Sequence, residues 1–193
     1  MPIDGAMGRA ELIADRHARF RTAIEPLLKV AFRVLQRLGV HDGEVDDALQ
    51  TVLVAADRKF DDLANRGDLK AYVCAACVNV ARDVGRRRAR QQVRNTWLDD
   101  LEEDPLAPGV DPADALERKQ ALAMIQWALD NMIPERREVF VLYELEELTA
   151  REIAEYLGVP PGTVASRLRK AREDLRTALD SVTEDSFFEQ GLR

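Results

Sequence analysis

The sequence has few of the residues on which most catalytic and metal sites depend. Its 193 residues include two histidines and two cysteines, and aromatic residues make up only 6%. His17 and His41 lie far from Cys74 and Cys77, so no familiar spacing gathers the four ligands of a zinc site. The sequence also lacks a phosphate-binding loop and a Ser/His/Asp set. We therefore expect a protein that is not an enzyme and that needs no metal or cofactor.

Long apolar segments are also missing. No run approaches the roughly 18–20 residues that cross a bilayer. Residues 1–20, MPIDGAMGRAELIADRHARF, lack the apolar core of a signal peptide. These two absences predict a cytoplasmic protein that does not interact with membranes.

The two cysteines form a Cys-x-x-Cys pair, Cys74 and Cys77, in the segment AYVCAACVNVAR. A redox pair normally opens a helix that follows a strand, whereas this pair lies inside an apolar helical run. We interpret both as small buried residues on a helix.

Helix-favouring residues and charge are what the sequence has in abundance. Ala, Leu, Arg and Glu are frequent, 33% of the residues are charged, and the formal net charge is −7. Residues 9–94 carry 17 basic and 12 acidic residues, residues 99–117 carry 8 acidic and no basic residues, and residues 118–177 carry 10 of each. The excess acidity therefore belongs to one internal segment and to the C-terminal end.

That internal segment separates two helical parts. Residues 97–117 hold three prolines and a glycine among the acids, a composition typical of a linker. Apolar periodicity predicts helices at 23–38, 46–60 and 69–90 before it, with a loop at 65–68, and at 121–132, 135–146, 149–157 and 161–179 after it. We predict an all-α protein with a helical bundle at 10–95, an acidic linker at 96–116, a four-helix domain at 117–180 and a tail at 181–193.

The last two predicted helices have the pattern of a helix-turn-helix. Thr149-x-x-Glu152 is a capping box, Gly158 suits the left-handed residue of the turn, and Pro160 and Pro161 suit a helix start. The apolar residues of each helix share one face: Ile153, Ala154 and Leu157 on the first, and Val164, Leu168, Ala171 and Leu175 on the second.

The opposite face of the second helix carries Thr163, Ser166, Arg167 and Lys170. In a helix-turn-helix this face enters the major groove, where arginine can pair with guanine and the others reach phosphates or base edges. The alternative is an ordinary helical hairpin with a solvated basic face. The run GRRRAR (85–90) is likewise either a solvated helix end or a second phosphate-binding surface.

These motifs resemble the extracytoplasmic-function sigma factors, group IV of the housekeeping-sigma superfamily. Residues 128–179, with IPERREVFVLYELEELTAREIAEYLGVPPGTVASRLRKAREDLR, resemble region 4. DDALQTVLVAADRKF, with its Asp-x-x-Gln, and NVARDVGRRR, with its Asn-x-x-x-Asp-x-x-Arg, resemble region 2. Thr51 after Gln50, and Tyr72 where tryptophan is usual, make region 2 the more divergent half.

The resemblance implies a protein that binds core RNA polymerase and directs promoter-specific transcription initiation. Region 2 of the family docks on the β′ clamp helices and opens the −10 element, and region 4 reads the −35 element beside the β flap. An anti-sigma factor is a further candidate partner. Carried over, the polymerase-binding residues are Asp46, Asp47 and Gln50; the −10 residues are Asn79, Arg82, Asp83, Arg86, Arg87 and Arg88; the −35 residues are Arg151, Thr163, Ser166, Arg167, Arg169 and Lys170.

A second hypothesis is a free-standing helix-turn-helix regulator in which residues 1–95 sense a signal or dimerise. It predicts tight promoter binding without polymerase and leaves the basic run at 85–90 unexplained. The tail contains Phe187 and Phe188, which are candidates for docking on a partner.

Overall fold

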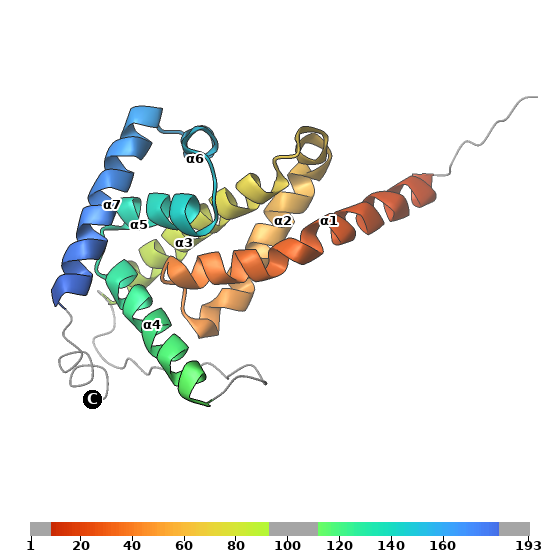
Figure 1. Ribbon diagram of the computed structural model, residues 1–193. Helices are drawn as coiled ribbons and strands as arrows, with labels where there is room; N and C mark the ends of the chain where they lie inside the picture. Colours follow the sequence, from red (N-terminus) through yellow and green to blue (C-terminus); the bar gives the residue numbers. More distant parts are fainter. Residues whose placement is uncertain (1–8, 93–111, 182–193) are drawn as a thin grey trace, which may run out of the picture.

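The structure, a computed structural model, describes residues 9–92 and 112–181, and over these residues every regular element is a helix (Figure 1). This confirms the predicted all-α class. The first part of the chain forms α1 (Arg9–Arg37), α2 (Asp42–Arg66) and α3 (Leu69–Gln92). The second part forms α4 (Pro112–Asp130), α5 (Pro134–Phe140), the π-helical turn η1 (Val141–Leu145), α6 (Ala150–Leu157) and α7 (Pro161–Ser181).

Glycines with positive φ follow the first two helices: Gly39 ends α1 as predicted, whereas α2 runs past the predicted end at residue 60 and stops before Gly67, inside the predicted loop 65–68. Gly39 has φ 86° just after α1, and the amide of Val40 bonds back to the carbonyl of Leu35 at 3.0 Å. Gly67 has φ 75° and caps α2 by donating its N–H to the carbonyl of Leu63. Only glycine adopts this backbone region without a steric cost, so a single local residue determines where each helix ends.

Helix α1 is much longer than its apolar stripe predicts. It begins at Arg9 and continues through the exposed Pro26, and its N-terminal half extends beyond the other helices (Figure 1). Its first turns carry the exposed side chains of Leu12 and Ile13. The prediction rested on burial periodicity and therefore stopped where burial stops.

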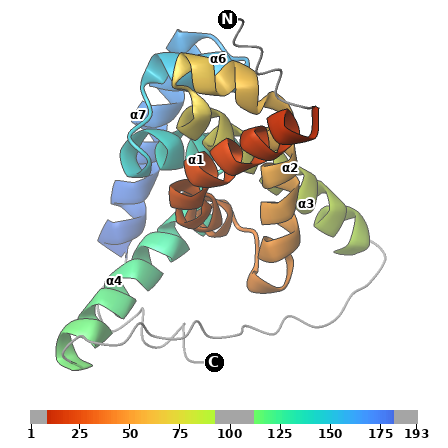
Figure 2. The same cartoon turned by 90° about the vertical axis from the view of Figure 1, so that its right-hand side faces the viewer.

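Helix α3 lies at the centre of the fold. Every residue from Val73 to Val78 is buried, as expected for a helix covered on more than one side. It packs against α1 and α2 on one side, and its start meets α6 of the second part (Figure 2). Cys74 and Cys77 are both fully buried on it, which confirms their interpretation as buried helix residues.

Burial also controls the chemistry of the two thiols. It raises the pKa of Cys74 to about 12 and that of Cys77 well above the usual value, so the reactive thiolate is scarce at neutral pH. Among the described residues, no group of three potential metal ligands forms around either cysteine.

Replacing both Cys74 and Cys77 with alanine should lower the free energy of unfolding by about 1–3 kcal/mol, because each change removes a buried sulfur from a packed core. Urea unfolding measures this change. Zinc content and oxidant response should not differ from the wild type. Stoichiometric zinc in the purified protein would contradict the structural assignment.

The predicted helix at 135–146 changes geometry partway. After α5 the chain makes the wider π turn η1, in which the amide of Glu146 bonds to the carbonyl of Val141 at 3.1 Å. This turn contains one more residue than an α-helical turn does. Glu147, which follows it, adopts a left-handed φ of 59°. Glu146, which lies between Leu145 and Glu147 at the end of this turn, is buried.

The two parts of the chain share one hydrophobic core. Buried residues of α1, α2 and α3 form a continuous cluster with those of the second part. Helix α4 begins at Pro112, so its first turns fall within the segment 96–116 assigned to the linker. The rest of the linker, and the tail with Phe187 and Phe188, lie outside the described residues. None of the described helices combines the length and apolarity needed to cross a bilayer.

Candidate nucleic-acid interface

Helices α6 and α7 form the predicted helix-turn-helix. The hydroxyl of Thr149 accepts the amide N–H of Glu152 at 3.2 Å, and the amide of Thr149 donates to the Glu152 carboxylate at 2.8 Å. Gly158 has φ 65° in the turn. Val164, Leu168 and Ala171 are buried and anchor α7 on the rest of the unit. The capping box and the turn are therefore confirmed as predicted.

Thr149→Ala should destabilise the helix-turn-helix by about 1 kcal/mol, the usual cost of losing a helix N-cap. Hydrogen bonds from the Thr149 hydroxyl and amide lower the pKa of Glu152. The stability from this shift is present above the ordinary glutamate pKa and is lost as pH falls through the lowered value.

The variant should therefore lose less stability on acidification than the wild type. Urea unfolding at pH 7 and at stepwise lower pH measures both effects. Thr177→Ala is the matched control, because the exposed Thr177 hydroxyl donates only to a carbonyl within α7. Equal acid dependence in the wild type and Thr149→Ala would contradict the assignment.

The outer face of α7 is open to solvent. Ser166 and Lys170 are exposed, Thr163 and Arg167 are half-buried, and the Ser166 hydroxyl donates to the Thr163 carbonyl at 3.0 Å. Within residues 9–92 and 112–181, neither Arg167 nor Lys170 forms an ion pair.

The two other residues predicted to read the −35 element lie beside this face. Arg151 is exposed near the start of α6, also without an ion pair among the described residues. Arg169 is exposed on α7 and pairs with Glu173 at 2.6 Å. All six predicted residues thus lie on the helix-turn-helix, and five of them lie on α7.

The residues predicted for −10 DNA divide into two groups on α3. Asn79, Asp83 and Arg86 are exposed and, being four and three residues apart, share one helix face. Asp83 pairs with Arg86, and Arg87 is exposed beside them. This exposed face is available to a ligand.

Arg88 and Arg82 form the second group, whose guanidinium groups are held by other parts of the protein. Arg88 donates to the Glu44 carboxylate at 2.7 Å and to the Gly39 carbonyl at 3.1 Å, which ties the end of α3 to the turn between α1 and α2. Arg82 donates from Nε and Nη2 to the two carboxylate oxygens of Glu138, at 2.6 and 2.5 Å. Neither contact could be read from local spacing.

Helix α2 presents the residues predicted to bind polymerase. Asp46, Asp47 and Gln50 are exposed, while Val52 is fully buried and fixes the orientation of the helix. Val54 is 52% exposed and lies between Asp47 and Gln50 in angular position around the helix. Sequence reasoning missed Val54, although an apolar residue four positions after Gln50 was a usable signal.

The contact between the two parts of the chain buries two acidic side chains. Glu138 and Glu146 are only 4% and 3% exposed. Arg37 of α1 pairs with Glu146 at 3.0 Å, and Lys70 of α3 donates to the Glu146 carbonyl at 2.6 Å. These residues, with Arg82, are called the inter-unit contact below. Its acids were also missed, although Glu138 shares a helix face with Val141 and Leu142 in an apolar stretch.

Aromatic packing and a close backbone approach complete the boundary between the units. The rings of Tyr72 on α3 and Tyr156 on α6 meet edge to face with centroids 6.1 Å apart. The guanidinium of Arg137 lies so close to Gly39 that an added Cβ would be 3.1 Å from its Nη1. The structure is therefore a closed arrangement in which the first and second parts touch directly.

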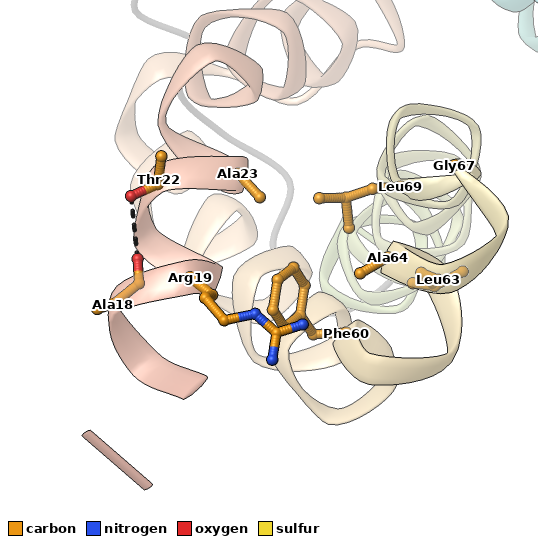
Figure 3. Close-up of a pocket in the computed structure, with 9 residues that line it drawn as sticks. All are labelled: Ala18, Arg19, Thr22, Ala23, Phe60, Leu63, Ala64, Gly67 and Leu69. Atoms are coloured by element: carbon orange, nitrogen blue, oxygen red, sulfur yellow. Dashed lines mark hydrogen bonds between the residues drawn. The ribbon is translucent and has the colours of Figure 1, made fainter. Parts of the chain in front are cut away.

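A separate hollow of about 560 Å³ lies between α1 and α2, near the start of α3 (Figure 3). Its lining is mostly apolar, and the guanidinium of Arg19 lies 6.0 Å from the centroid of the Phe60 ring. The hollow contains no acidic, histidine or cysteine side chain, and it does not adjoin the predicted DNA-binding residues. It contributes nothing to the candidate interface.

The sequence is similar to those of known RNA polymerase sigma factors. Residues 122–175, which include α6 and most of α7, match the family described as Sigma-70, region 4. The chain is 30% identical over 161 residues to an RNA polymerase sigma-E factor of Streptomyces avermitilis, covering 83% of each chain. It is 29% identical over 148 residues to the ECF RNA polymerase sigma factor SigE of Mycolicibacterium smegmatis, covering 77% of this chain and 56% of the relative.

A solved structure shares the fold. The sigma factor RpoE, crystallised in complex with the anti-sigma factor NepR from Bartonella quintana, superposes with a TM-score of 0.68 at 20% sequence identity. The match covers 86% of this chain and 99% of that one. The similarity therefore extends over both helical units and is not limited to the helix-turn-helix.

Proposed function

The chain belongs to the extracytoplasmic-function sigma factors of RNA polymerase, and from this membership we propose how its surfaces direct transcription initiation. The protein binds core polymerase in the cytoplasm through the exposed face of α2 around Asp47, Gln50 and Val54. It reads the −35 element with α7 and the −10 element with α3. It acts without chemistry of its own, by bringing the polymerase to a promoter.

The single observation that carries this assignment is the solvent-exposed outer face of α7. The buried apolar side chains on the opposite side of α7 hold the helix in place. They leave Ser166, Arg167 and Lys170 on the side that can contact DNA. A hairpin with a merely solvated basic face would not require the capping box, the left-handed glycine and the match to region 4 together.

The acidic composition supports dependence on polymerase. Non-specific affinity grows with the number of phosphates that a protein neutralises. Here a basic first part is tethered to a linker with 8 acids, and residues 118–177 are neutral overall. Near ~0.15 M salt the Debye length of about 8 Å confines attraction to direct contacts. The free protein should therefore bind duplex promoter DNA weakly.

Core polymerase changes this balance by holding both units on one promoter. The second DNA contact then becomes effectively intramolecular and adds to the first. Gel-shift titration with and without core tests the proposal, with run-off transcription from the same fragment. Core-dependent binding and promoter-specific transcripts are expected. Tight specific binding without core would instead favour a free-standing regulator.

An anti-sigma factor is the proposed inhibitory partner. The solved structure of RpoE contains one, NepR, and the fold similarity to RpoE spans both units of this chain. Co-purification of the tagged chain from its own cells, followed by reconstitution of the captured protein with core polymerase, tests this. The partner should suppress run-off transcription, and a captured protein that leaves transcription unchanged would argue against it.

A further inference from the structure

Two ion pairs hold α7 from opposite edges of its buried face. On one edge, Nη1 of Arg136 in α5 donates to both carboxylate oxygens of Asp174, at 2.8 Å each. On the other edge, Nε of Arg172 donates to the Glu144 carboxylate of η1 at 2.7 Å, and its guanidinium lies 5.8 Å from the centroid of the Tyr143 ring. Arg172 and Asp174 leave the helix about 160° apart, because each residue turns an α-helix by about 100°.

Asp174 continues the stripe of α7 that is predicted to contact DNA. Thr163, Arg167 and Lys170 are spaced by four and three residues, so they share one face of the helix. Asp174 comes four residues after Lys170 and lies on the same face. A free carboxylate at this position would repel the phosphates that the stripe is predicted to meet.

The Asp174 carboxylate would also attract Lys170 if it were free. Side chains four residues apart on a helix are neighbours, close enough for an ammonium and a carboxylate to pair. Here Arg136 takes the carboxylate instead, and both side chains are mostly covered, at 27% and 30% exposed. Lys170 is exposed and makes no ion pair within residues 9–92 and 112–181. The Lys170 ammonium is therefore available to a ligand.

We propose that Arg136 is a positioning residue for promoter recognition, which occupies Asp174 and so leaves Lys170 free for a DNA phosphate. This inference rests on the proposed function, since it needs the outer face of α7 to contact DNA. Without Arg136, Asp174 pairs with Lys170 and the stripe loses a phosphate contact. The Arg172–Glu144 pair also holds α7, but its acid belongs to η1 on the other edge and does not compete for Lys170.

The test measures the salt dependence of DNA binding, which a purely structural role of Arg136 would leave unchanged. The probe is a fluorescently labelled DNA duplex of mixed sequence, titrated with the full chain between about 0.02 and 0.1 M salt. Arg136→Ala should lower the slope of log affinity against log salt by about 0.9, the contribution of one phosphate contact. The same relation predicts a loss of affinity on the order of tenfold at ~0.05 M salt.

Arg172→Ala is the matched control. It removes the same charge and also cuts a tie between α7 and its neighbours, yet its slope should stay at the wild-type value. Arg136→Lys should also keep the wild-type slope, because a single nitrogen makes both bonds to Asp174 and a lysine ammonium can replace it. Circular dichroism and urea unfolding check that each variant is folded at the temperature of the titration.

Further variants test whether the effect passes through Lys170. In a Lys170→Ala background, Arg136→Ala should lower the slope no further, because the phosphate contact is already absent. Adding Asp174→Asn to Arg136→Ala should restore most of the slope, because asparagine carries no charge to hold the lysine. Adding Glu144→Gln to Arg172→Ala makes the same charge change on the other edge and should leave the slope unaltered.

Three results would overturn the inference: a wild-type slope for Arg136→Ala, an equal loss for Arg172→Ala, or an undiminished loss in the Lys170→Ala background. Run-off transcription by the wild-type chain with core polymerase is measured in parallel. Promoter-specific transcripts together with an unchanged slope for Arg136→Ala would reject the positioning role and leave the proposed function standing. An absence of transcripts would reject the proposed function, whereas the slopes alone decide the role of Arg136.

Discussion

Asp47→Arg is expected to abolish co-purification of the chain with core RNA polymerase. Asp47 is exposed on α2, and Gln50 and Val54 lie on the same side of the helix. Removing one partner of a hydrogen-bonded charge pair at an interface typically costs about 2–5 kcal/mol, and reversal adds repulsion to that loss. At micromolar protein concentrations such a loss should leave no detectable complex.

The fold should survive this change. The Asp47 side chain makes no ion pair among the described residues, and the buried Val45, Ala48 and Val52 that hold α2 are untouched. Circular dichroism and thermal unfolding check this point. Asp62→Arg is the matched control, since it makes the same charge change at an exposed position near the other end of α2. Full recovery of core polymerase with Asp47→Arg would remove α2 from the polymerase interface.

Val54→Ala tests whether an apolar contact on this face of α2 contributes to polymerase binding in addition to the charge of Asp47. The Val54 side chain is 52% exposed, so its exposed part does not contribute to the stability of the fold. It would contribute to binding if a partner covered it. The substitution should weaken core binding less than Asp47→Arg does, without lowering stability appreciably. Unaltered core binding would mark Val54 as an ordinary surface residue.

Arg167→Ala is expected to weaken recognition of the cognate −35 element by about 1–3 kcal/mol, the usual loss when a bidentate contact to a base is removed. The loss should be smaller for DNA with an altered −35 sequence, because the contact reads a base. Lys170→Ala should instead weaken all sequences alike and reduce the dependence of affinity on salt by about one charge. Promoter titrations of the reconstituted holoenzyme at several salt concentrations distinguish the two roles.

Arg176→Ala controls for the loss of one positive charge. It lies on α7 about two turns beyond Lys170, is exposed and makes no ion pair among the described residues. Its affinity and its salt dependence should stay close to the wild-type values. If Arg167→Ala and Lys170→Ala both transcribe at wild-type levels from the cognate promoter while still binding core, α7 is not the −35 reader.

Local features of the sequence determined most of the helix-turn-helix. Thr149 and Glu152 are three residues apart and satisfy each other's backbone, and Gly158 takes the left-handed turn. The spacing of Val164, Leu168 and Ala171 defines the buried face of α7 and, by exclusion, the exposed one. Each of these signals acts over one or two helical turns, where residue spacing alone sets which side chains meet.

The inter-unit contact was decided only by tertiary structure. Arg82 and Glu138 are 56 residues apart, and Arg37 and Glu146 are 109 apart. Many arginines and acids of this chain have equivalent local surroundings, so no spacing rule selects these pairs. The choice depends on the packing of α3 against the second unit and on the π turn at whose end Glu146 is buried. The sequence thus predicted which helix faces contact DNA, whereas only the fold decided that Arg82, one of the predicted residues, is paired with the buried carboxylate of Glu138.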